Sequence, residues 1–149
     1  MTIPHFFQSS EIACGPACLR MLMAGMGVPL EEREITLHCE LTELGTTIHD
    51  LEQAARAFGF QTESLRIFHD SRATDVLSNS APFVAMIDLA SLYGMGPMFR
   101  WHFVVPLTLD KDHIRFHDPA DGPDRRVGCE DFLVAWATAG YHGLRLWMR

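Results

Sequence analysis

The chain has 149 residues, of which 48% are hydrophobic and 21% are charged. This balance excludes a disordered or fibrous protein and predicts one globular domain over residues 1–149, large enough to fold without disulfides or a structural metal. The formal net charge of -7 disfavours nucleic acid and anionic membranes as partners.

The sequence has neither a long apolar segment nor a secretion signal at its start. No stretch approaches the run of about 18 apolar residues that a membrane helix needs. The opening sequence MTIPHFFQSSE lacks the basic and hydrophobic regions of a signal peptide. We therefore expect a cytoplasmic protein with no integral membrane segment. Its four unevenly spaced cysteines are then expected to be reduced thiols: Cys14, Cys18, Cys39 and Cys129.

Three helices are predicted in the N-terminal part of the chain. Pro16 suits a first helical turn and Gly25 suits a helix end, so residues 14–25 are expected to form the first helix. A short second helix follows Pro29, with acidic residues in its first turn. The third lies within 45–60, GTTIHDLEQAARAFGF, where apolar residues recur at helical spacing.

The rest of the chain is rich in strand-forming residues and predicts an antiparallel sheet. Short apolar runs bounded by polar turns are typical of strands. We expect strands at 61–68, 82–90, 102–109, 113–118 and 141–149, helices at 71–80 and 130–140, and loops at 90–100 and 119–128. N-terminal helices packed on a C-terminal antiparallel sheet would make an α+β fold.

The runs at 102–109 and 113–118 predict a β-hairpin that joins a histidine to an aspartate. If the turn is centred on Asp110, His102 lies directly opposite Asp118, within hydrogen-bonding reach. Pro106 indicates a sheet edge or a bulge. A one-residue slip would bring His117 opposite His102 instead and separate the pair.

Cys14 stands at the start of the first predicted helix, where free N–H groups and the helix dipole favour a thiolate. The competing interpretation is a buried structural cysteine, because Cys is among the residues most often buried. Cys18, one turn further along, fits that structural interpretation. A zinc site on Cys14 and Cys18, completed by His38 or Cys39, fits the usual ligand spacing poorly, so no metal or other cofactor is expected.

Taken together, these residues resemble a known family. The similarity is carried, in chain order, by Gln8, Cys14-Gly15-Pro16-Ala17-Cys18, His102-Phe103-Val104-Val105, Asp118-Pro119 and Gly122. The sequence resembles the bacteriocin-processing cysteine peptidases, family thirty-nine of the cysteine peptidases, which have a papain-like fold and cleave leader peptides after a double glycine. The resemblance implies that Cys14 is the nucleophile, His102 the general base and acid, Asp118 the group that orients the imidazole, and Gln8 an oxyanion-hole donor.

Two features depart from the family pattern. Many members have an acidic residue immediately before the nucleophile, whereas this chain has Ala13. Members are often cytoplasmic domains of ATP-driven exporters, but this sequence contains neither membrane spans nor a phosphate-binding loop of the form GxxxxGK[ST]. We therefore expect a free-standing domain that could meet its substrate alone or pair with a separate exporter.

The resemblance predicts a thiol peptidase with a peptide substrate, and two alternatives stay open. The same acyl-enzyme could pass its acyl group to an amine, which would make the protein an acyltransferase. Alternatively, the cleft could hold a peptide without cleaving it. The loop before His102 is expected to line the substrate cleft or to act as a lid, through Tyr93, Met95, Met98 and Phe99.

Overall fold

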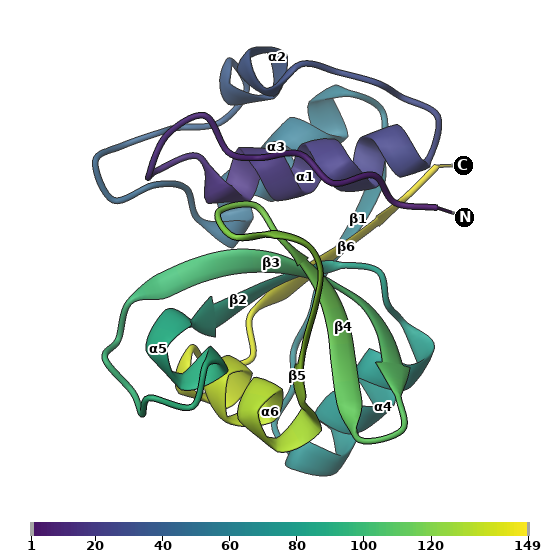
Figure 1. The fold of residues 1–149 in the computed structure, drawn as a ribbon. Helices are drawn as coiled ribbons and strands as arrows, with labels where there is room; N and C mark the ends of the chain where they lie inside the picture. The colour runs from purple at the N-terminus through teal and green to yellow at the C-terminus, as the bar shows by residue number, and fades with distance from the viewer. Residues whose placement is uncertain (1, 149) are drawn as a thin grey trace.

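A computed structural model of the chain describes residues 2–148 and contains one layer of strands with helices on both sides (Figure 1). The helices are α1 (Cys14–Gly25), α2 (Glu32–Thr36), α3 (Ile48–Ala57), α4 (Asp70–Asn79), α5 (Leu89–Leu92) and α6 (Cys129–Thr138). The strands are β1 (Gln61–Ser64), β2 (Val84–Asp88), β3 (Trp101–Asp110), β4 (His113–Asp118), β5 (Gly122–Gly128) and β6 (Gly143–Trp147). The predicted α+β class is confirmed.

The strands form a six-stranded sheet in the order β1-β6-β2-β3-β4-β5. Every neighbouring pair is antiparallel. The last strand, β6, lies between β1 and β2, next to the edge of the sheet that β1 forms. The central pair of β2 and β3 carries His102, which lies opposite Ile87.

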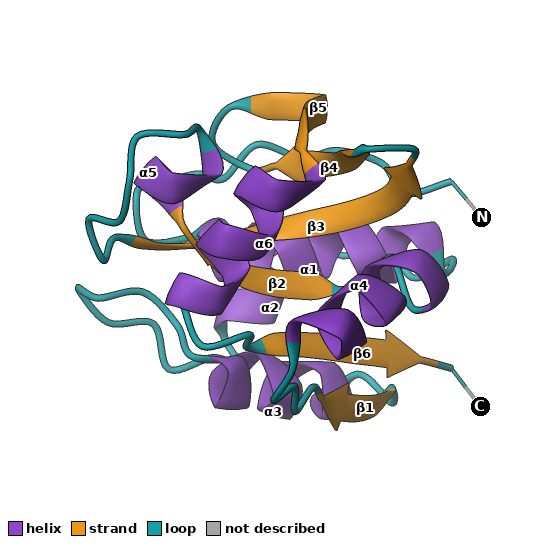
Figure 2. Cartoon of the chain, turned by 90° about the horizontal axis from the view of Figure 1, so that it is seen from below, coloured by secondary structure: helices purple, strands orange, loops and turns teal. Residues whose placement is uncertain are grey.

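Helices cover both faces of this sheet (Figures 1 and 2). The predicted N-terminal layer is present, because α1 and α3 pack on one face in a core that includes Leu19, Leu51 and Val105. A second layer of α4, α5 and α6 lies on the opposite face, around Phe83 and Trp136. Burying the sheet on both faces explains why β2 is apolar without interruption from Val84 to Ile87.

Helix α1 lies against β3 because its first turn carries no bulky side chain at Gly15. A Cβ atom on Gly15 would stand 2.3 Å from Thr46 Oγ1 and 3.3 Å from Phe103 Cδ2. The absence of a side chain therefore lets the start of the helix approach β3 closely. No side chain caps this end of α1, so the backbone N–H of Cys14 is left to act on the nearby site.

The hairpin of β3 and β4 differs from the predicted register by three residues beside the turn and by two residues beyond the bulge. Asp110 pairs with His113 and Val105 pairs with His117, because the turn contains only Lys111 and Asp112. The predicted direct pairing of His102 with Asp118 is therefore wrong. Beyond the bulge, a shift of two residues keeps paired side chains on the same face as predicted, and the bulge itself follows Pro106, as predicted.

Two predicted loops contain regular structure. Residues 122–128 form β5, which pairs with β4 although most of its side chains are polar and exposed. This strand is defined by backbone hydrogen bonds at a sheet edge, and an edge strand needs no apolar pattern. Within 90–100, residues up to Leu92 belong to the short helix α5, which begins where the Asp88 carboxylate accepts a hydrogen bond from Ser91 N.

Candidate active site

Three of the predicted site residues meet where α1 contacts the β3–β4 hairpin. Cys14 is the first residue of α1, His102 is the second residue of β3, and Asp118 is the last residue of β4. His102 Nε2 and Asp118 Oδ1 are 2.7 Å apart, and both side chains are buried. An ionised carboxylate can only accept hydrogen bonds, so His102 donates from Nε2 and its Nδ1 is left to interact with the Cys14 thiol.

Cys14, His102 and Asp118 shift one another's pKa values in the directions that favour a charged thiolate, imidazolium and carboxylate. Burial by itself would raise the pKa of Cys14, but hydrogen bonding and charge from His102, with backbone N–H groups of Phe103 and Gly15, lower it below 9.0. Burial would lower the pKa of His102, but Asp118 and Cys14 raise it to about 9. Asp118 is held below its ordinary value, because hydrogen bonding and charge from His102 outweigh its burial.

This pattern favours a thiolate and imidazolium pair over a neutral thiol and imidazole. The thiolate is the nucleophilic form of cysteine, and an adjacent imidazole that a third group orients is the arrangement that activates it. The three residues can therefore attack an electrophilic carbonyl carbon and deliver a proton to the group that leaves.

The backbone of Gln8 is bound next to Asp118, but its side chain has a local partner. Its backbone N–H donates to Pro119 O at 2.9 Å, which fixes it next to the residue that follows Asp118. Its side-chain Nε2 donates to Ser10 O at 2.8 Å, and its Oε1 is buried without a hydrogen-bond partner. One amide hydrogen stays available, so a role as an oxyanion donor remains a prediction.

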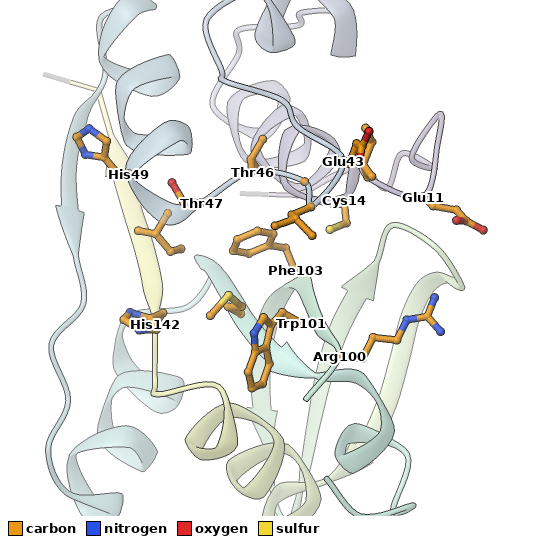
Figure 3. A pocket seen from close by; sticks show the side chains of 15 residues that line it. Glu11, Cys14, Glu43, Thr46, Thr47, His49, Arg100, Trp101, Phe103 and His142 are labelled. Atoms are coloured by element: carbon orange, nitrogen blue, oxygen red, sulfur yellow. The ribbon is translucent and has the colours of Figure 1, made fainter. Parts of the chain in front are cut away.

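A pocket of about 750 Å³ opens beside Cys14 (Figure 3). Its walls come from three parts of the chain: the segment before α1, the connection from α2 to α3 with the start of α3, and the β2–β3 region with His142. The lining residues are Glu11, Ile12, Cys14, Glu43, Leu44, Gly45, Thr46, Thr47, Ile48, His49, Met86, Arg100, Trp101, Phe103 and His142. Its charged side chains Glu11, Glu43 and Arg100 lie toward one end, and its histidines lie toward the other.

The four residues predicted to contact substrate lie outside the lining of this pocket. Met95, Met98 and Phe99 are exposed on the loop before β3. Phe99 packs edge to face on Trp101, with ring centroids 6.0 Å apart, and Trp101 does line the pocket. Tyr93 instead donates from its hydroxyl to Asp118 Oδ2 at 2.9 Å. Contact of these four residues with a substrate remains a prediction.

Sequence reasoning missed most of the pocket walls. The segment 41–47 shows no regular pattern in the sequence, and only the approach of α1 to Thr46 brings it to Cys14. The position of Trp101 could have indicated a pocket residue, because Trp101 immediately precedes the predicted catalytic residue His102. Consecutive strand residues lie on opposite faces, so its side chain points away from that of His102. Its aromatic ring is half-exposed at the pocket.

The other three cysteines lack the surroundings of Cys14. All four thiols are free. Burial raises the pKa of Cys18 well above its ordinary value and that of Cys39 to about 11. Within residues 2–148, no three of the His, Cys, Asp and Glu side chains gather closely enough to hold a metal ion. None of the helices in the same range is long and apolar enough to cross a membrane.

Comparisons with known protein sequences agree with this geometry. Residues 2–141 match the model of the peptidase C39 family. An uncharacterized protein of Methanothermobacter marburgensis is 31% identical over 115 residues, which cover 77% of this chain and 70% of that protein. A second uncharacterized protein, from Methanothermobacter thermautotrophicus, is 27% identical over 115 residues, with the same coverage.

Solved structures with the same fold confirm the predicted papain-like architecture. A double glycine motif protease from an AMS/PCAT transporter, in complex with the leader peptide, has a TM-score of 0.79 at 19% identity and covers 97% of this chain and 91% of its own. The peptidase domain of Streptococcus ComA, a bifunctional ABC transporter in a quorum sensing pathway, has a TM-score of 0.79 at 18% identity and covers 99% and 100%. A structure described as a C39-like peptidase from Bacillus anthracis has a TM-score of 0.76 at 15% identity and covers 99% and 96%.

Proposed function

Because the chain belongs to the peptidase C39 family, we propose that it is a thiol peptidase that cleaves a peptide bond through an acyl-enzyme on Cys14. The observation that carries the proposal is the connected line from Cys14 through His102 to Asp118, with its lowered thiol pKa and raised imidazole pKa. A cysteine that serves only in packing does not require an imidazole beside its thiol. Retention of all three groups also argues against a cleft that only holds a peptide.

The first half of the reaction forms a thioester. Cys14 Sγ attacks the carbonyl carbon of the scissile bond, and the negative charge moves to the carbonyl oxygen. The backbone N–H of Cys14 and the remaining amide hydrogen of Gln8 would stabilise that oxyanion. The C–N bond then breaks, and the proton on His102 passes to the leaving amine.

The second half releases the acid. His102, now neutral, takes a proton from a water molecule as that water attacks the thioester carbon. The C–S bond breaks, the peptide leaves as a carboxylic acid, and the thiolate and imidazolium pair forms again. Asp118 keeps the imidazole in one tautomer throughout, because its oxygen accepts from Nε2.

We propose that the substrate is a peptide with small residues, such as Gly-Gly, before the scissile bond. Support comes from the fold, which the chain shares with a double glycine motif protease. A structural relative was solved in complex with a leader peptide. A separate exporter as partner and action in the cytoplasm, where free thiols persist, are parts of the same proposal.

The test is cleavage of synthetic peptides that contain an internal Gly-Gly sequence, compared with peptides that have Val-Val instead. We expect Gly-Gly peptides alone to be cut, with one ¹⁸O atom from labelled water in the new carboxyl group. Cys14→Ala should abolish cleavage, whereas Cys129→Ala, which changes a cysteine at the first position of α6, should leave it unchanged. Full activity of Cys14→Ala would refute the proposal. Transfer of the acyl group to an added amine in preference to water would identify an acyltransferase instead.

A further inference from the structure

The two carboxylate oxygens of Asp118 have different partners. Oδ1 lies 2.7 Å from His102 Nε2 and also accepts from the backbone N–H groups of Ala120 at 2.9 Å and Asp121 at 3.3 Å. Oδ2 has one donor among the described residues, the Tyr93 hydroxyl at 2.9 Å. Asp118 is only 1% exposed, so water has little access to Oδ2. Without Tyr93, a charged oxygen would be buried without a hydrogen bond, which is costly.

Tyr93 is held in place by a carboxylate on the neighbouring strand. Tyr93 is the C-cap residue of the short helix α5, and Asp88 is its N-cap residue. Asp88 is fully buried and accepts hydrogen bonds from Ser91 Oγ at 2.6 Å, Arg100 N at 3.0 Å and Met98 N at 3.1 Å. The Asp88 side chain therefore binds residues on both sides of Tyr93, and these hydrogen bonds hold the loop that carries the tyrosine.

We propose that Tyr93 is a positioning residue of the active site, which donates to Asp118 Oδ2 and thereby keeps Asp118 charged and oriented toward His102. This inference rests on the proposed peptidase function and deepens it. It gives Tyr93 a role that acts through Asp118 and His102, in place of the substrate contact that its loop position predicts.

Tyr93 affects the active site by changing the pKa of Asp118. Loss of its hydroxyl would let Asp118 take up a proton at higher pH, since a hydrogen bond to the charged form favours that form. A protonated Asp118 no longer stabilises the His102 imidazolium, and the Cys14 thiolate then loses its counter-charge. Other charged groups around the pair are Asp121 and Arg125, which act on Tyr93, and His5, whose Nε2 lies 2.7 Å from Asp118 O.

The first experiment measures the rate of Cys14 alkylation by iodoacetamide between about pH 5 and pH 9, by peptide mass spectrometry. In Tyr93→Phe we expect the rise of this rate to move to higher pH. At the acid end the rate should fall about ten-fold, as expected from the loss of one hydrogen bond to a buried charge. The matched control is Tyr141→Phe, because Tyr141 also donates to a carboxylate, that of Asp70, outside the pocket. It should follow the wild-type profile.

The second experiment observes the contact without relying on Cys14. The chain has two tyrosines, so Tyr93 is the sole tyrosine of Tyr141→Phe, and phenolate absorbance then reports Tyr93 alone. We expect its pKa to lie above the ordinary value of 10.0, because of burial and the neighbouring Asp118. Adding Asp118→Asn should lower it, since that change removes the negative charge next to the phenol.

The outcomes separate this inference from the function on which it rests. If Cys14 of the wild type is alkylated at low pH and Tyr93→Phe gives the same pH profile, the role of Tyr93 is overturned and the peptidase proposal stays intact. A wild-type Cys14 that is unreactive below about pH 6 would contradict the proposed function. In that case the absorbance titration still decides the contact, and an ordinary Tyr93 pKa that Asp118→Asn does not change would refute it.

Discussion

Cys14 and Cys129 each occupy the first residue of a helix, yet their thiol pKa values move in opposite directions. The pKa of Cys129 is raised by burial and by the charges of Asp112 and Glu130. The pKa of Cys14 is lowered despite stronger burial, because His102 supplies a hydrogen bond and a positive charge. A helix start alone therefore does not account for a reactive cysteine in this protein, and the imidazole makes the difference.

This contrast predicts selective alkylation of Cys14. At about pH 6 we expect iodoacetamide to modify Cys14 and to leave Cys129 largely unmodified, because only the first is held as a thiolate. His102→Ala should abolish the selectivity, whereas His113→Ala, at an exposed position of the same hairpin, should preserve it. Peptide mass spectrometry measures both sites in one sample. Equal labelling of Cys14 and Cys129 in the wild type would contradict the assignment.

A second prediction concerns the pH dependence of kcat/KM for a cleaved peptide. The reactive pair exists above the lowered pKa of Cys14 and below the pKa of His102, which is about 9. We therefore expect a plateau at neutral pH and a loss of activity as the pH rises through about 9, where His102 loses the proton that the leaving amine needs.

Asp118→Asn tests the source of that upper limit. It removes the charge that raises the pKa of His102, so the alkaline limit should move to lower pH and the plateau should fall about 100-fold. Asp110→Asn, an exposed residue on the same hairpin, provides the matched control. An unchanged alkaline limit in Asp118→Asn would show that Asp118 does not govern the imidazole.

Local patterns in the sequence were enough to find the elements that carry the site. Pro16 and Gly25 bound α1, and the periodicity of 45–60 marks α3, because capping and amphipathic spacing are properties of neighbouring residues. The hairpin was predicted, but its register was wrong by two residues beside the site. The turn depends on Lys111 adopting a positive φ of 58°, and a lysine in the sequence does not indicate that conformation.

What the sequence could not reveal depends on distant contacts. Tyr93 lies 25 residues from Asp118, and the loop between them is folded back by hydrogen bonds from Met98 N and Arg100 N to Asp88. A polar edge strand such as β5 has no apolar pattern to reveal it, because its partner β4 supplies its hydrogen bonds. The family resemblance predicted which residues react, but it gave no indication of the contact between Tyr93 and Asp118.

Gly15→Ala should destabilise the protein and displace Cys14. The new Cβ would stand 2.3 Å from Thr46 Oγ1 and 3.2 Å from Leu51 Cδ2, so α1 must move away. We expect a loss of about 1 to 3 kcal/mol in the free energy of unfolding, measured by chemical denaturation, and lower activity. Gly128→Ala, where the added Cβ has no neighbour closer than 4.0 Å, should be nearly neutral. Partial recovery in the double variant with Thr46→Ala would identify the hydroxyl as the obstacle.

Trp101→Ala should weaken substrate binding while the fold is kept. Trp101 is half-exposed at the pocket wall and packs on Phe99, so its loss removes contact area for a peptide. We expect kcat/KM to fall about ten-fold, mainly through a higher KM. Trp147→Ala removes a similarly exposed tryptophan outside this pocket and should have no effect on KM. An unchanged KM in Trp101→Ala would place the substrate elsewhere.

Asp88→Asn should loosen the loop that carries Tyr93. An amide has one oxygen in place of two and turns an NH₂ group toward backbone N–H donors, so hydrogen bonds from Ser91, Met98 and Arg100 cannot all be kept. We expect a loss of about 1.5 to 3 kcal/mol in the free energy of unfolding at neutral pH, and faster proteolysis between residues 93 and 100. Asp75→Asn, an exposed position on α4, should change neither quantity.

The stability lost in Asp88→Asn should itself depend on pH. Burial would raise the pKa of Asp88, but its hydrogen bonds to Ser91, Arg100 and Met98 outweigh that effect and hold it below 3.8. A carboxyl group whose pKa is lower in the folded state contributes stability above its unfolded-state value and loses it as the pH falls through the folded value. The difference in stability between the wild type and Asp88→Asn should therefore be full at neutral pH and shrink below about pH 4. A difference that stays constant down to about pH 3 would mean that the Asp88 charge does not hold the loop.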